Sequence, residues 1–314
     1  MATTQEPLGQ RAFEAGRTRN VRRGRKIKAS TPYLLLLPAI LLVAGLLLYP
    51  MLRTIYLSFF SFGMADMAAR EFVGWSNYRH LAFDSQELRS SLRFTVMFTI
   101  ITIVIELVLA FAFALVLDTV RRGRAVLATI GILPFMVASI AVGLVWRLLF
   151  ARDVGLVNHV IGFFGFEPVN WLAMPGPAMA SAIIAEIWAT MPFVMLILLA
   201  GLTSIPGDVL EAGRTDGAKP MQLFRYVTFP LLLPSFTVAL VFQTVLKIRV
   251  FDLVFILTEG GPGGLTTPLG LLIYRQFFRY SQSGLASASS VILLLFGGII
   301  CVAYVKLLYR EVEY

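Results

Sequence analysis

Cysteine, histidine and charge are all scarce in this sequence. Its 314 residues include one cysteine, Cys301, and two histidines, His80 and His159, which lie in different polar stretches. One cysteine cannot form a disulfide within the chain, and these three residues do not have the spacing of a Cys/His metal site. Charged residues make up 14% of the chain, whereas a soluble domain has about a quarter. The composition therefore argues against a water-soluble fold.

Motifs for catalysis and nucleotide binding are also missing. The G-x-x-x-x-G-K-[ST] phosphate loop does not occur, and the glycine-rich stretch Gly260–Gly264 lacks its lysine. The chain has no H-E-x-x-H, no serine–histidine pair and no paired carboxylates at a useful spacing. We therefore expect neither an ATPase nor an intramembrane enzyme, and no metal or cofactor held by this chain.

Apolar residues, in contrast, make up 58% of the chain, and the mean hydropathy is +0.79. They form six runs long enough to cross about 30 Å of hydrocarbon as helices: Pro32–Phe59, Phe94–Leu117, Ala125–Phe150, Ala178–Leu202, Phe229–Leu253 and Leu285–Leu308. Helices are expected because backbone in lipid must satisfy its own hydrogen bonds. The sequence predicts an all-α polytopic membrane protein with six transmembrane helices.

Basic residues collect on one predicted side of the membrane. The net charge is +9, and basic clusters lie at 17–28, before the first run, and at 121–124, between the second and third. The positive-inside rule places such clusters in the cytoplasm, and we prefer this interpretation to nucleic-acid binding. The first run is too long for a signal peptide, so we expect it to be retained.

This topology divides the chain into two parts. Residues 1–30 form a basic cytoplasmic arm whose composition is compatible with disorder, and residues 31–314 form the six-helix domain. Both termini are then cytoplasmic. The loops near 60–93, 151–177 and 254–284 face outward, while those near 118–124 and 203–228 face the cytoplasm.

The last inner loop, Thr203–Thr228, is longer than a connection between two spans requires. Ile205–Asp208 offers a turn and a helix start, a short helix follows as far as Gly217, and a second helical turn over Met221–Tyr226 leads to Pro230. The pattern predicts a helix-turn-helix at the membrane surface, available to a cytoplasmic partner. An ordinary amphipathic connector would give the same pattern.

Motifs in this loop resemble those of a known family. Glu211-Ala212-Gly213, Asp216-Gly217-Ala218 and Val227-Thr228-Phe229-Pro230 are similar in order and spacing to the E-A-A, D-G-A and I-x-L-P groups of binding-protein-dependent ABC importer permeases. Gly213 replaces an alanine, which costs a helix about 1 kcal/mol. Val227 and Phe229 replace the usual isoleucine and leucine. We expect docking to survive these departures.

Other segments resemble the carbohydrate branch of that family, of the maltose and glycerol-phosphate type. Phe72–Tyr78 is similar to its F-V-G-x-x-N-Y segment, Trp188–Phe193 to its W-x-x-x-P-F segment, and Phe251–Pro262 to its F-D…L-T-x-G-G-P segment. The resemblance extends over Pro32–Tyr309. The chain looks like the first, maltose-type permease of a pair of non-identical permeases, although a homodimer remains an alternative.

The resemblance implies a type I ABC importer permease fold and alternating access driven by other subunits. Two nucleotide-binding subunits would hold ATP and magnesium, and a soluble solute-binding protein would deliver solute to this subunit in the bacterial cytoplasmic (inner) membrane. A cytoplasmic coupling helix would dock on the ATPase through Glu211, Ala212, Gly213, Asp216, Gly217 and Ala218.

A solute site is implied near the middle of the membrane. Maltose-type permeases line theirs from spans three, four and five, and matching their motifs nominates Phe135, Ser139, Glu186, Thr190, Phe193, Gln243, Lys247 and Val250. Ionisable and amide residues inside spans are costly in lipid, and six occur here: Glu106, Glu186, Gln243, Lys247, Arg249 and Asp252. Aromatic faces and polar groups suit a sugar ring and its hydroxyls.

Lys247 has two interpretations. The family usually has a small or neutral residue at this position, so a lysine facing the solute would favour an anionic sugar or a sugar phosphate. Alternatively, Lys247 and Glu186 pair with each other or with the backbone and hold the bundle together.

The solute itself is not determined by the sequence: neutral sugar, polyol, acidic sugar and glycerol phosphate all fit. An ion-coupled secondary carrier is the other class of transporter considered. Such carriers commonly show internal repeats and more spans, which this sequence lacks, and they have no use for an ATPase-docking loop.

Overall fold

A computed structural model describes residues 31–65, 69–120 and 122–308. The basic arm at 1–30 lies outside the described residues. The chain divides into two units, one ending at Leu52 and the other beginning at Arg53. The helices of the second unit carry every site discussed below.

The first predicted span is a helix with one local irregularity. It consists of α2 (Thr31–Val43), a π-helical turn η1 (Ala44–Leu48) and α3 (Tyr49–Leu57), which crosses the boundary between the units. Its apolar stretch Leu36–Leu57 has a mean hydropathy of 2.0, and none of it is buried within the chain. Side chains such as Leu42 and Leu46 are exposed. Such a surface requires lipid or another protein around it.

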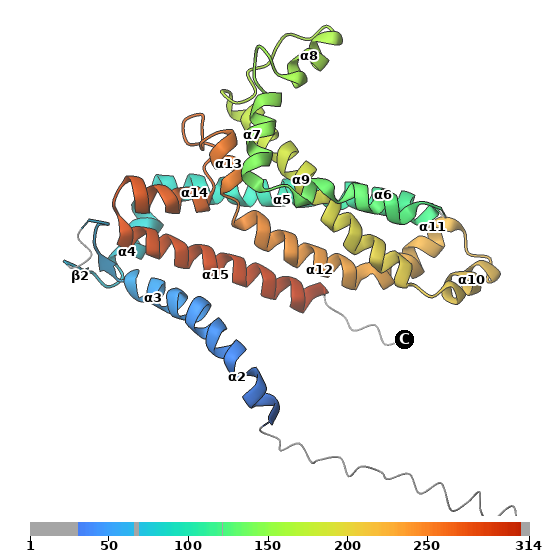
Figure 1. Cartoon of the computed structure of the whole chain (residues 1–314), viewed down its shortest axis with the longest axis horizontal. Helices are drawn as coiled ribbons and strands as arrows, with labels where there is room; N and C mark the ends of the chain where they lie inside the picture. The colour runs from blue at the N-terminus through green and yellow to red at the C-terminus, as the bar shows by residue number, and fades with distance from the viewer. Residues whose placement is uncertain (1–30, 66–68, 121, 309–314) are drawn as a thin grey trace, which may run out of the picture. The chain divides into compact units, whose positions relative to one another are not determined.

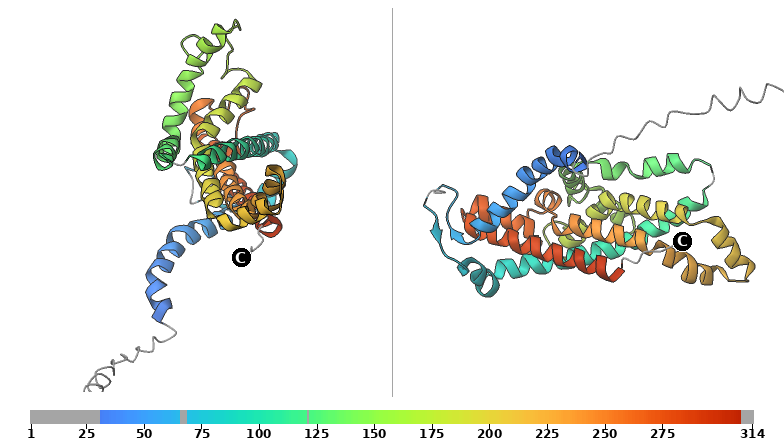
Figure 2. Two further views of the ribbon diagram at one scale, coloured as in Figure 1. Left: turned by 90° about the vertical axis from the view of Figure 1, so that its right-hand side faces the viewer. Right: turned by 90° about the horizontal axis from the view of Figure 1, so that it is seen from below.

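Four long helices form the core of the second unit (Figures 1 and 2): α5 (Gln86–Thr119), α9 (Pro175–Ser204), α12 (Phe229–Ile248) and α15 (Ser283–Leu308). Helix α12 contacts the other three, and α5 also packs along α9. Ala110 and Ala114 are fully buried in this core, where small side chains let helices approach closely. Ser85 caps α5 by accepting a hydrogen bond from the Leu88 amide at 3.1 Å.

The third predicted span is interrupted. In place of one helix over Ala125–Phe150, the chain forms α6 (Arg124–Gly131), a 3-10 turn η3 (Leu133–Met136) and α7 (Ser139–Leu149). Pro134 lies in the 3-10 turn, since proline has no amide hydrogen to continue the helical ladder. Among the described residues five helices are long and apolar enough to cross a membrane, and α7 is a shorter apolar helix. The predicted count of six holds only approximately.

The fifth predicted span ends earlier than Leu253. Helix α12 stops at Ile248, Phe251 is non-helical (φ −142°, ψ −65°), and a new helix, α13 (Asp252–Leu257), follows. The amide of Val250 still donates to the Lys247 carbonyl at 3.1 Å. The backbone is therefore opened over Arg249–Phe251, between α12 and α13.

Short elements connect the long helices. They are β1 (Phe60–Ser61), β2 (Glu71–Phe72), α4 (Ser76–Arg79), η2 (His80–Asp84), α8 (Leu156–Phe163), α10 (Gly207–Thr215), α11 (Pro220–Leu223), η4 (Phe224–Thr228), α14 (Leu269–Tyr274) and η5 (Arg275–Arg279). The two strands pair antiparallel, with Phe60 opposite Phe72. Figures 1 and 2 show α10 and α11 at one end of the bundle, and the strands with α4 and α14 at the opposite end. The segment over α8, which was predicted to lie on the same side as the strands and α14, projects from the side of the bundle instead (Figure 1).

One buried amide organises the segment between α7 and α9. The Nδ2 group of Asn158 donates to the carbonyls of Arg152 (2.9 Å) and Val169 (3.0 Å), while its Oδ1 accepts from the Val169 amide (3.1 Å) and from Trp171 Nε1 (2.9 Å). Asn158 is almost fully buried. All its hydrogen-bonding groups are used, which fixes the path of the segment over α8.

We expect Asn158→Asp to loosen this segment, because a carboxylate oxygen would replace the NH2 group and face the carbonyls of Arg152 and Val169 without a hydrogen to donate. The free energy of local opening should fall by roughly 2 kcal/mol or more. Tryptic cleavage after Arg152 and hydrogen exchange at Val169 measure this opening. The matched control is Val160→Ala on the exposed side of α8, which should leave both unchanged; equal effects of the two variants would contradict the assignment.

Candidate functional site

The segment predicted to couple to a motor folds as two short helices. Helix α10 spans Gly207–Thr215 and α11 begins at Pro220, which confirms the predicted helix-turn-helix. The D-G-A motif forms the C-terminal cap of α10: the Ala218 amide donates to the Gly213 carbonyl (3.1 Å) and the Gly217 amide to that of Arg214 (3.0 Å). Gly217 has φ +79°, a conformation that glycine adopts without steric cost. The motif thus ends the helix sharply.

The departure at Gly213 has a local explanation. A Cβ atom built at this position would lie 2.6 Å from Leu223 Cδ1 of α11, so an alanine would require Leu223 to move. Glycine lets the two helices cross closely. Glu211, Ala212 and Asp216 are exposed on α10 and its cap, and are available to another protein.

The second site is a cavity of about 330 Å³ where the interrupted helices meet. Five nominated residues line it: Phe135, Ser139, Glu186, Thr190 and Val250. The rest of the lining comprises Val137, Val142, Ala189, Phe242, Leu246, Arg249, Phe251, Asp252 and Leu253.

Helix interruptions place several of these side chains. Phe135 lies in the 3-10 turn at Pro134, Ser139 begins α7, and Val250 lies in the opened backbone after α12. Glu186 and Thr190 are one turn apart on α9, and the Thr190 hydroxyl donates to the Glu186 carbonyl at 2.8 Å. Non-helical backbone at membrane depth is tolerated where it lines a cavity, as it does here.

Aromatic rings support one wall. Phe135 and Phe193 stack with centroids 4.7 Å apart and an angle of 16° between their planes. Phe193 also contacts Phe242, at 4.8 Å. Phe193 therefore lies behind Phe135 and Phe242, outside the lining itself, and holds their faces in place.

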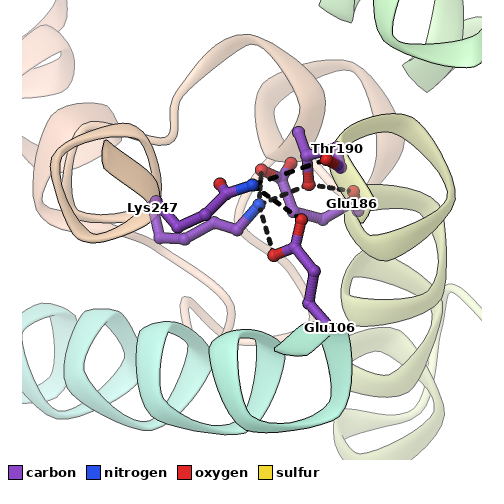
Figure 3. A network of polar contacts seen from close by, with 5 residues as sticks. Glu106, Glu186, Thr190 and Lys247 are labelled. Carbon is purple, nitrogen blue, oxygen red and sulfur yellow. Dashed lines mark hydrogen bonds and ion pairs between the residues drawn. The ribbon is translucent and has the colours of Figure 1, made fainter. Parts of the chain in front are cut away.

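A network of polar contacts, which we call the lysine cluster, consists of Lys247, Glu106, Glu186, Thr190 and Gln243 (Figure 3). Lys247 Nζ is 2.9 Å from Glu186 Oε1, 3.3 Å from Glu106 Oε2 and 2.5 Å from Thr190 Oγ1. Gln243 Nε2 donates to Glu106 Oε1 at 2.8 Å. The cluster joins α5, α9 and α12 at one point. The pairing of Lys247 with Glu186 is one of the two arrangements that the sequence had left open.

Three nominated residues do not line the cavity: Gln243 and Lys247, which are buried, and Phe193, which is half-buried. Lys247 is 0% exposed, and it does not appear in the lining. Conversely, Arg249 and Asp252 do line the cavity and are exposed. Their charge within a predicted span indicated a functional role. The sequence could not show that they line the cavity, because this depends on α12 ending at Ile248. Phe242 gave no signal beyond its place in an apolar helix.

Comparisons with known proteins agree with this architecture. Residues 106–314 match the family described as "Binding-protein-dependent transport system inner membrane component". The chain is 35% identical to the trehalose/maltose transport system permease of Thermococcus litoralis, over 89% of this chain and 94% of that protein. It is 32% identical to the sulfoquinovosyl glycerol transport system permease of Agrobacterium fabrum, over 88% and 89% of the two chains.

A solved structure has the same fold. A chain of a bacterial ABC transporter involved in the import of the acidic polysaccharide alginate superimposes with a TM-score of 0.76, covering 90% of this chain and 96% of that one at 23% identity. This similarity shows a type I importer permease fold. The chain therefore belongs to the binding-protein-dependent transport system inner membrane component family and is a membrane-spanning permease subunit of an ABC importer.

Proposed function

We propose that this subunit conducts a sugar or sugar derivative through the cavity between α7, α9 and the end of α12. The observation that carries the proposal is the cavity itself, which combines aromatic faces with a few polar groups where two predicted spans are interrupted, at Pro134 and at Arg249–Phe251. Ligand sites in transporters commonly lie at such interruptions. Relatives named for trehalose, maltose and sulfoquinovosyl glycerol support a carbohydrate-type solute.

Each part of the lining has a role in this proposal. Phe135 and Phe242 offer ring faces to the apolar side of a sugar, and Ser139 and Thr190 offer hydroxyl groups. Glu186 offers a carboxylate to sugar hydroxyls. Phe193, Gln243 and Lys247 act from behind the wall, and Val250 contributes the opened backbone.

Coupling to ATP hydrolysis is assigned to the surface of α10 and its cap. Glu211, Ala212, Gly213, Asp216, Gly217 and Ala218 would fit a groove on a nucleotide-binding subunit, which holds the ATP and magnesium. Two such subunits, a second permease and a solute-binding protein complete the importer. The α10 end of the bundle and both termini would then face the cytoplasm, and the opposite end would receive the solute-binding protein.

We expect Phe135→Ala to slow sugar uptake because it removes a ring face from the cavity. Loss of such a contact corresponds to roughly 3- to 10-fold in rate or affinity. Uptake of radiolabelled trehalose by proteoliposomes containing the complete importer measures the effect. Met136→Ala, at an exposed neighbour outside the cavity, is the control. Equal loss in both variants would argue against this cavity as the solute path.

A cross-linking experiment tests the coupling surface. Cys301 is the chain's one cysteine, so Cys301→Ala gives a background without thiols. In it, Ala212→Cys should cross-link to the nucleotide-binding subunit, whereas Phe163→Cys, exposed on α8, should not. Labelling of the cysteine at 212 by an impermeant maleimide added outside intact cells would refute the proposed orientation.

The cap of α10 allows a graded test. Gly217→Ala places a side chain at φ +79° and should cost about 1 kcal/mol, so amide exchange over 213–218 should accelerate roughly fivefold. Solute-stimulated ATP hydrolysis should fall as well. Gly207→Ala at the other end of α10 meets no atom within 4 Å and has no positive φ, so it is the matched control. Unchanged exchange in Gly217→Ala would show that the cap does not stabilise α10.

A further inference from the structure

The Lys247 ammonium is held away from the cavity by its partners. It donates hydrogen bonds to Glu186 Oε1 and Thr190 Oγ1, and it forms an ion pair with Glu106 Oε2 at 3.3 Å. Its side chain is fully buried. A lysine bound in this way cannot also recognise an anionic solute, so its role must be exerted through its partners.

Glu186 is the charged member of the lysine cluster that reaches the cavity. Its side chain is 10% exposed and belongs to the lining, whereas the side chain of Glu106 is 1% exposed and does not. Of the two carboxylate oxygens of Glu186, Oε1 alone forms a hydrogen bond or ion pair with a described residue. Its second oxygen retains acceptor capacity for a hydroxyl group.

Lys247 is needed to hold that carboxylate in place. Glu186 is a buried charge, and such a charge is tolerated only when it is paired. Lys247 in turn is held by Glu106, which Gln243 fixes with a hydrogen bond of 2.8 Å. The order from interior to cavity is therefore Glu106, Lys247, Glu186.

The charges around the cavity favour a neutral solute. Two acids, Glu186 and Asp252, and one base, Arg249, line it. Behind the wall Lys247 and Glu106 cancel in formal charge. The cavity therefore has one excess negative charge, which repels an anion and accepts hydrogen bonds from hydroxyls.

We propose that Lys247, held by Glu106, is a positioning residue that fixes the Glu186 carboxylate at the cavity wall as an acceptor for solute hydroxyls, so that the subunit selects an uncharged polyhydroxylated solute over an anionic one. This inference rests on the proposed function of the cavity. It narrows the solutes that the sequence had left open to neutral sugars and polyols.

The test compares variants that remove different members of the cluster. The complete importer is reconstituted in proteoliposomes with its solute-binding protein, and the solute transported per ATP hydrolysed is measured for trehalose, maltose, glucuronate and glycerol 3-phosphate. The affinity of the binding protein for each solute is measured separately and its loading is held constant, so that differences report on the membrane subunit.

Glu186→Gln and Glu106→Gln each remove one carboxylate from the same lysine. Glu186→Gln should lower neutral sugar transported per ATP by roughly 10- to 100-fold, the effect of losing a hydrogen bond to a charged group. Glu106→Gln keeps the Lys247–Glu186 pair and leaves an amide oxygen beside the ammonium, so neutral sugar transported per ATP should fall by less than about threefold. A purely structural cluster would respond alike to both substitutions.

Lys247 is tested without leaving two carboxylates unpaired. The double variant Lys247→Met with Glu106→Gln has the same net charge of −1 as the native cluster, but Glu186 loses its ammonium partner. This variant should still assemble, and its neutral sugar transported per ATP should be as low as that of Glu186→Gln. Two results would overturn this inference and leave the proposed function intact. One is an equal amount of neutral sugar transported per ATP by Glu106→Gln and Glu186→Gln; the other is a wild type that transports the two anions in preference to the neutral sugars. No uptake or stimulated hydrolysis with any solute would overturn the proposed function, and this inference with it.

Discussion

A single buried ammonium determines how the central helices of this permease meet. Lys247 of α12 is sealed between Glu106 of α5 and Glu186 of α9. An unpaired charge at this depth would cost several kcal/mol, so the three helices are constrained to keep their contacts at this level. This constraint is specific, because it fixes both the rotation of each helix about its axis and its position along the bundle. Packing of leucine and alanine side chains alone defines these less well. The cavity lies directly beside it.

The second constraint concerns the backbone. In lipid, a helix can be interrupted only where the freed amide and carbonyl groups are covered by protein or water. Both interruptions of predicted spans, at Pro134 and at Arg249–Phe251, contribute to the same cavity. The site is thus the place where the fold departs from regular helices, and those departures supply Phe135, Ser139 and Val250 to its wall.

The two sites occupy different parts of one bundle. Helices α10 and α11 lie at one end, and α9 and α12, which flank them in the chain, carry Glu186 and Lys247 further along the bundle. A force applied to α10 would therefore reach both members of the ion pair through continuous helices. The sharp cap at Gly217 and the close crossing at Gly213 keep this end compact. This connection supports the proposed coupling role of α10.

The sequence by itself determined the membrane class, the all-α architecture, the position of most spans and the two helices of the Thr203–Thr228 loop. These follow from local properties: apolar runs, turn residues and caps act over a few neighbouring positions. It also nominated Glu186 and Lys247 as candidate site residues, because a charged side chain within a span is costly in lipid. Only the tertiary structure decided that Lys247 faces Glu106 and Glu186 in place of the solute, that Arg249 and Asp252 line the cavity, and that the third span is interrupted. Those outcomes depend on which side chains meet across helices that are distant in sequence, and on whether neighbouring protein covers an opened backbone. A local sequence pattern carries no information on either of these two factors.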